Sequence, residues 1–129
     1  MAKLFLLYGL PFVSVTLSAN GKSLFLARVL VDTGSGGSVF KTDDLAEVDI
    51  LPGDADIIRN ISGIGGEEGV IEKQIASIEV GDLSLSPFTI QIGALDYGFE
   101  MDGIIGADFL LKTGAVIDFD AMEIGKKRK

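Results

Sequence analysis

The chain has 129 residues, a formal net charge of −8, and neither cysteine nor histidine. These values exclude disulfides, thiolate metal sites and the Ser-His or Cys-His nucleophile systems, and the acidic balance opposes nucleic-acid binding. Any acid–base chemistry therefore falls to carboxylates, Lys or Tyr. The length predicts one domain over residues 1–129. The 17 glycines, among many Val, Ile and Leu residues, indicate a mostly-β domain with tight turns.

The first twenty residues follow strand patterns. Residues 4–8 and 12–18 are strand-like and are broken at residues 9–11, and Asn20-Gly21 predicts a hairpin because both residues tolerate positive φ. The apolar stretch 4–8 is too short to span a membrane, and no clean signal-peptide cleavage pattern follows it. We therefore expect a cytoplasmic protein that does not associate with membranes.

An acidic residue ends the next strand. Residues 24–31 read as a buried strand, and Asp32 follows at its end, where a charge is costly. Thr33, Gly34 and Ser35 come next. Glycine allows a tight turn that directs its N–H toward the carboxylate, and Ser35 can donate a hydrogen bond to a carboxylate oxygen, which favours the ionised form. Asp-Thr-Gly also occurs in ordinary turns, so the apolar approach strand is what gives the motif weight.

Short elements and glycine-rich turns alternate in the middle of the chain. Residues 43–47 predict one helical turn with acids at its positive end, and residues 57–61 predict a short strand. Residues 62–69 form a glycine-dense hairpin tip that suits a mobile lid. The chain then returns as a long strand over residues 70–80, and a further strand is expected at residues 87–92.

A second motif follows about seventy residues after Asp32. An apolar approach ends at Asp102, and Gly103, Ile104, Ile105 and Gly106 come directly after it. Residues 107–112 then predict a short helix that Gly114 closes, residues 115–119 a core strand, and residues 122–124 a strand that pairs back onto it.

Asp-Thr-Gly-Ser, a glycine-rich hairpin and Gly-Ile-Ile-Gly stand in the order and spacing of the retropepsin-like, single-domain aspartic proteases, which the chain resembles over roughly residues 12–119. The resemblance implies a mostly-β fold, namely the small closed β-barrel of the retropepsin-like acid proteases with a flap hairpin and one short helix near the C-terminus. It also implies that the strand of Gly103, Ile104, Ile105 and Gly106 threads beside the Asp32 loop.

The resemblance further implies an aspartic endopeptidase that cleaves extended peptides or proteins. Members with one Asp-Thr-Gly motif act as homodimers, so Asp32 of each subunit would supply half of the catalytic pair. Two close carboxylates share one proton; one accepts a proton from water while the other donates to the carbonyl oxygen, so neither a cofactor nor a metal is expected. Thr33 would bond across to the partner loop, Gly34 and Ser35 would complete the active-site loop, and a flap tip would cover the substrate backbone with Gly63, Ile64, Gly65 and Gly66.

The sequence departs from the viral members of this family at several places. Gly36 and Ala107 stand where those members carry an Asp–Arg pair that supports the dimer. The chain also continues past residues 115–119, and a strand folding back there would occupy the edge used for an intersubunit sheet. The alternative is therefore a catalytically inactive peptide-binding or dimerisation module on the same fold. Ser35, where viral members have Ala and pepsin-like enzymes have Ser, predicts an acid-shifted activity profile.

Other residues offer competing interpretations. Asp102 and Asp108 are candidates for a second acid within one chain, but Asp102 matches a structural position of the family, and Asp108 suits a helix N-terminus because of the helix dipole. The glycine-rich segment 32–38 could form an anion-binding nest. No Lys follows it at P-loop spacing, and the net charge opposes phosphate.

Overall fold

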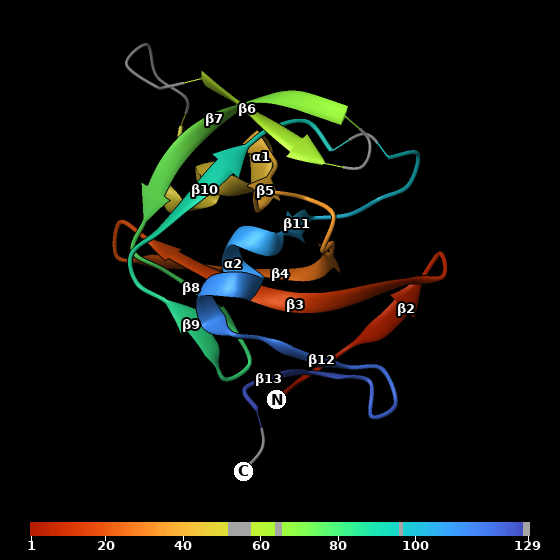
Figure 1. Ribbon diagram of the computed structural model, residues 1–129. Helices are drawn as coiled ribbons and strands as arrows, with labels where there is room; N and C mark the ends of the chain where they lie inside the picture. Colours follow the sequence, from red (N-terminus) through yellow and green to blue (C-terminus); the bar gives the residue numbers. More distant parts are fainter. Residues whose placement is uncertain (52–57, 64–65, 96, 128–129) are drawn as a thin grey trace.

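The computed structural model describes residues 1–51, 58–63, 66–95 and 97–127, and strands dominate them, which confirms a mostly-β chain (Figure 1). The helical elements are α1 (Thr42–Leu45), η1 (Ala46–Val48) and α2 (Ala107–Thr113). The strands are β1 (Ala2–Lys3), β2 (Phe5–Leu7), β3 (Leu10–Ala19), β4 (Lys22–Val31), β5 (Val39–Phe40), β6 (Ile58–Gly63), β7 (Gly66–Ile75), β8 (Ser77–Val80), β9 (Leu83–Leu85), β10 (Phe88–Ile92), β11 (Gly103–Ile105), β12 (Val116–Asp118) and β13 (Glu123–Gly125).

One large, curled sheet forms most of the molecule. Its strands follow the order β6-β7-β10-β5-β11-β4-β3-β8-β9, and β2 pairs with β3. The pairs β4–β11 and β5–β10 are parallel, so β4 and β11 end at the same edge of the sheet. Among the described strands, β6 and β9 stand at the two ends of this ladder and do not pair with each other. The sheet is thus a curled half-barrel, and closure into a barrel stays a prediction.

The turns that shape this sheet follow the expected chemistry in part. Asn20 and Gly21 have φ of 54° and 74°, which confirms the predicted hairpin between β3 and β4. A second hairpin turn lies at Tyr8 and Gly9, and β3 already begins at Leu10, inside the predicted break. The predicted single strand over residues 70–80 is wrong, because the structure has two strands there, β7 and β8, separated at Ala76. The Ala76 N–H donates to the Ser18 carbonyl oxygen of β3.

A smaller sheet is built from the two ends of the chain. β13 pairs with β12, as predicted for the strand that folds back, and β1 pairs with the other edge of β13, giving the order β1-β13-β12. This sheet and the N-terminus lie at the bottom of Figure 1, whereas the β6–β7 hairpin lies at the top. No helix within the described ranges is long and apolar enough to cross a membrane.

Two apolar clusters occupy opposite faces of the large sheet, because successive residues of a strand point to opposite sides. The larger cluster packs against α2, whose Phe109 is fully buried and meets the ring of Phe88 edge-on. Along the central strands this core cluster takes Val29, Val31, Phe40, Ile90, Ile92 and Ile105. The smaller cluster, on the other face, consists of Phe12, Leu30, Val39, Met101 and Ile104, with Phe5, Leu7, Leu95 and Phe99 packed against it.

Candidate active site

Asp32 lies just past the end of β4, beside the second sequence motif. Its N–H donates to the Ile105 carbonyl oxygen at 2.9 Å, which extends the parallel β4–β11 ladder by one bond. Alternation along the strand places the Asp32 side chain on the face of Leu30, opposite the sealed core. The residue is partly buried in the single chain. The sheet thus presents one carboxylate on the face that α2 does not cover.

The loop after Asp32 holds the carboxylate by local hydrogen bonds. The Gly34 N–H donates to Asp32 Oδ1 at 3.0 Å, the contact expected from the glycine turn. Ser35 behaves differently from the expectation: its hydroxyl donates to the Gly37 carbonyl oxygen at 2.8 Å, and its backbone N–H to the Asp32 carbonyl oxygen at 3.2 Å. Ser35 therefore stabilises the turn rather than the carboxylate, and the acid-shifted activity profile stays a prediction. Thr33 is exposed.

The second motif supports this loop from beneath, as the resemblance implied. The Ala107 N–H donates to the Ser35 carbonyl oxygen at 2.7 Å. A Cβ atom at Gly106 would collide with the Gly37 carbonyl oxygen and crowd that of Ser35, so only glycine fits at this crossing. Gly103 is similarly confined by the Phe40 ring. Gly106 is thus required by close packing of two backbones.

A buried polar cluster, which the sequence interpretation did not include, ties the loop to α2. Ser38 is fully buried; its hydroxyl donates to Asp108 Oδ1 at 2.8 Å and accepts from the Gly106 N–H at 3.0 Å. The Ser38 N–H donates to Asp108 Oδ2 at 3.1 Å, and the Phe109 N–H to Asp108 Oδ1 at 2.8 Å. Asp108, in the first turn of α2, therefore accepts one N–H of that turn and fixes the far end of the Asp32 loop. The one sequence feature that could have indicated this cluster is the position of Ser38, a polar residue directly before the buried strand β5.

Asp102 has a structural role at the beginning of β11. Its Oδ2 accepts from the Arg28 backbone N–H at 2.9 Å, and its own N–H donates to the Arg28 carbonyl oxygen at 2.7 Å. The Arg28 guanidinium adds an ion pair at 3.8 Å. The carboxylates of Asp102 and Asp108 are thus occupied by Arg28 and Ser38, so neither is a suitable second acid for Asp32.

The hairpin predicted between the two motifs is present. β6 and β7 pair from Ile58↔Ile71 up to Gly63↔Gly66. Ile64 and Gly65, the expected centre of the flap tip, lie outside the described residues. The hairpin continues the sheet beyond β10 and lies above β5 and β11 in Figure 1.

One acidic group has a displaced pKa. Burial raises the pKa of the Asp44 carboxyl; Lys41 opposes this shift, and the charges of Asp102, Glu47 and Asp43 add to it. The Lys41 Nζ lies 3.9 Å from Asp44 Oδ2, too far for a hydrogen bond, and in the described part of the chain this oxygen is buried without a hydrogen-bond partner. The unfavourable burial of this charge therefore concerns α1 and not the Asp32 loop.

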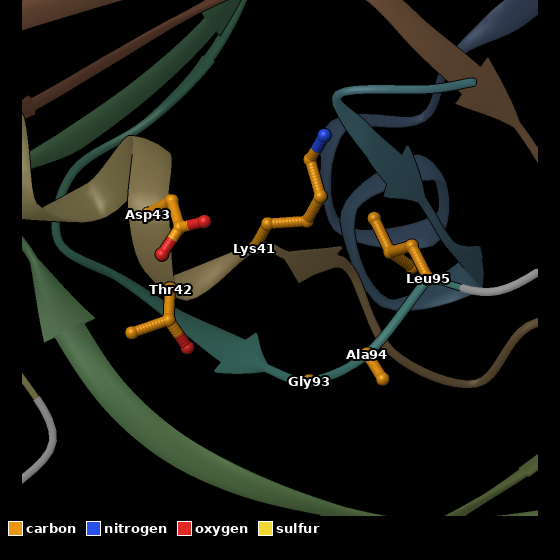
Figure 2. A pocket seen from close by; sticks show the side chains of 6 residues that line it. All are labelled: Lys41, Thr42, Asp43, Gly93, Ala94 and Leu95. Carbon is orange, nitrogen blue, oxygen red and sulfur yellow. The ribbon is translucent and has the colours of Figure 1, made fainter.

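A hollow of about 400 Å³ opens where β5 and β10 end. Figure 2 shows the side chains of Lys41, Thr42, Asp43, Ala94 and Leu95 around it, with Gly93 completing the wall. Its lining includes no residue of the Asp32 loop. Within the described ranges, no group of three or more His, Cys, Asp or Glu residues is placed to hold a metal ion.

The comparison with protein families identifies the class. Residues 13–109 match the aspartyl protease family, from β3 through the first turn of α2. The match covers most of the chain and includes both motifs, so the chain belongs to the aspartyl protease family. No curated protein matches the sequence.

Proposed function

We propose that this chain is an aspartic endopeptidase that hydrolyses peptide bonds by a carboxylate-activated water, with an active site formed by two copies of Asp32 in a homodimer. The observation that carries the proposal is the position of Asp32: a carboxylate at the sheet edge, held by the Gly34 N–H at 3.0 Å and tied through its own N–H to Ile105. Membership of the aspartyl protease family supports the reaction type.

The chemistry needs two carboxylates within a few ångströms. At that distance they cannot both ionise cheaply, so the pair shares one proton at working pH. The ionised member accepts a proton from the attacking water, and the protonated member donates to the carbonyl oxygen of the scissile bond. Asp102 and Asp108 are engaged elsewhere, which favours a second chain as the source of the second acid.

Two features of the chain fit a two-fold dimer. Exposed Thr33 is free of the packing that fixes Gly34 and Ser38, so it can bond to the same loop of a second copy. β12 has β13 on one edge, and its other edge pairs with no strand in the described part of the chain. Exposed Val116 and Phe119 lie on and beside this strand, so a second copy can add both main-chain pairing and apolar contact.

The proposed substrate is an extended peptide or protein segment with apolar residues around the cleaved bond. It would lie on the Asp32 face of the sheet, because α2 and the core cluster fill the opposite face. The β6–β7 hairpin would close over it as the flap, with Gly63 and Gly66 flanking the tip.

Mixing two variants tests both parts of the proposal. Wild-type protein should cleave a casein-derived peptide pool, and Asp32→Asn should lose about a hundredfold or more of kcat/KM. Adding excess Asp32→Asn protein to wild type should inhibit it, because mixed dimers carry only one ionisable Asp32. Sedimentation across a concentration series should show a monomer–dimer equilibrium whose midpoint coincides with the rise of specific activity.

Asp43→Asn is the matched control, since Asp43 is exposed and lies in α1 rather than in the loop. It should neither lose activity nor inhibit wild type. Full cleavage by Asp32→Asn would overturn the catalytic assignment. A monomer at every concentration, with no cleavage, would instead favour a non-catalytic peptide-binding module on the same fold.

A further inference from the structure

A row of paired residues crosses the sheet on the face that carries Asp32. In each pair the two residues lie opposite one another on neighbouring strands, so their side chains share one face. From the hairpin side to the N-terminal side the row consists of Glu72, Gln91, Val39, Ile104, Leu30, Phe12 and Phe5. Asp32 follows Leu30 by two residues on the same face. The row is therefore the floor on which a peptide near Asp32 would lie.

The two halves of this row differ in chemistry. From Val39 to Phe5 it is apolar, and Leu95 and Phe99 pack against this apolar cluster. Gln91 on β10 is the first polar residue after this apolar stretch. Its chain neighbours Ile90 and Ile92 belong to the core cluster on the other face. Gln91 is only 7% exposed. A large polar side chain thus stands at the transition from the apolar floor to the hairpin.

The Gln91 side chain carries a hydrogen-bond acceptor at its amide oxygen. In the described part of the structure, its Oε1 is buried and has no hydrogen-bond partner. Leaving a buried acceptor unpaired costs about 1–3 kcal/mol, so an apolar residue would suit folding better at this position. A buried, unpaired acceptor on the Asp32 face points to a donor that arrives with a ligand.

The position of Gln91 fits a contact with bound peptide. Its register partner Glu72 lies on β7, which is one of the two strands of the β6–β7 hairpin. Gln91 therefore lies at the base of the proposed flap, where a covered peptide would pass. At this end the row consists of two polar residues, Gln91 and its register partner Glu72.

We propose that Gln91 is a specificity-determining residue whose Oε1 accepts a hydrogen bond from an uncharged amide or hydroxyl side chain of the peptide. The inference rests on the proposed function, since it takes the Asp32 face as the substrate face. Gln91 would make the enzyme prefer a polar side chain at one position of the peptide, whereas the apolar part of the floor favours apolar side chains. Only a donor satisfies the acceptor, so a methyl or thioether of equal size is the disfavoured competitor.

Cleavage of paired peptides tests the inference. The probe is a pool of short peptides around a central Phe–Leu bond, in which each flanking position carries Gln or Met, or Thr or Val. At one position wild type should prefer the donor member by about threefold to tenfold in kcat/KM, the range of one neutral hydrogen bond. Gln91→Met should abolish this preference. Thr89→Val, on the same strand and face, is the control and should retain it.

A binding arm separates this inference from the protease proposal. Immobilised Asp32→Asn protein is mixed with the same pool, and the bound peptides are compared with those bound by the Asp32→Asn, Gln91→Met double variant. Wild type could cleave no peptide while the binding preference is present and depends on Gln91. The endopeptidase proposal would then fail, and the inference about Gln91 would stand. Urea unfolding checks that Gln91→Met is folded, and its midpoint should not fall. An unchanged preference in Gln91→Met, or no preference in either arm, would overturn the inference.

Discussion

The two faces of the large sheet differ although the same strands build both. On β11, Ile105 points into the core cluster beneath α2, whereas its neighbour Ile104 points to the face of Asp32. Both residues are at most 1% exposed. The core face is closed by Phe109 and its neighbours. The Asp32 face carries a carboxylate, an amide oxygen that has no partner among the described residues, and a hairpin at one end.

The difference teaches that burial alone does not separate packing from function in this molecule. The core face has residues that satisfy one another, so any change there acts through stability. The Asp32 face keeps polar groups that cost free energy in the isolated chain. Variants placed on adjacent residues of one strand can therefore separate the two contributions.

The largest expected effect comes from truncating the core face. Ile105→Ala should lower the free energy of unfolding by about 2–5 kcal/mol, because it removes methyl groups from a fully packed site. Ile104→Ala should destabilise by a similar amount but should also lower kcat/KM for apolar peptides by about tenfold. Urea unfolding and initial rates per folded molecule measure both. Equal effects of the two variants on activity would remove the functional distinction between the faces.

Gly106→Ala should have the next largest effect. The added Cβ would meet the Gly37 carbonyl oxygen, so the Asp32 loop and α2 must move apart, at a cost of about 1–3 kcal/mol. Because this crossing positions Asp32, kcat should fall more than stability alone explains. Gly114→Ala is a control that destabilises without touching the loop, since Gly114 has φ of 63° and open space around it. A folded Gly106→Ala protein with wild-type kcat would contradict the positioning role.

Much of this architecture follows from the sequence, because it depends on local patterns. The hairpin at Asn20-Gly21, the helix after Gly106 and the returning strand β13 were predicted from turn residues and periodicity. The Gly34 contact to Asp32 was predicted from the motif itself.

Features that depend on distant contacts did not follow from the sequence. The Ser35 hydroxyl was expected to donate to the Asp32 carboxylate, and only the folded loop shows that the Gly37 carbonyl oxygen accepts its hydrogen bond. Ser38 and Asp108 are seventy residues apart, so no local pattern joins them. Gln91 reads as an ordinary strand residue until the register places it beside Val39.

Ser38→Ala should show how firmly the Asp32 face depends on the buried polar cluster. The change leaves the Gly106 N–H without its acceptor and removes one hydrogen bond from Asp108, which costs about 1–3 kcal/mol. The loop should loosen, so kcat should fall while KM changes little. Ser38→Thr retains the hydroxyl and should recover most of kcat. Loss of stability with unchanged kcat would assign Ser38 to folding alone.

The smallest expected effect concerns Asp44, which belongs to neither face. Burial raises its pKa in the folded chain, so the folded state holds the proton more tightly than the unfolded chain. Stability attributable to this group therefore falls as pH rises through the interval from the unfolded to the folded pKa, and the penalty is complete above it.

Asp44→Asn removes that penalty and should raise the free energy of unfolding at neutral pH by less than about 1 kcal/mol, because the Lys41 ion pair is lost as well. The gain should shrink as pH falls toward 3.8, the ordinary pKa of Asp, where Asp44 is already protonated in the folded chain. Urea titrations at several pH values, with exposed Asp120→Asn as the control, measure this dependence. A gain that grows toward acid would show that burial does not govern the ionisation of Asp44.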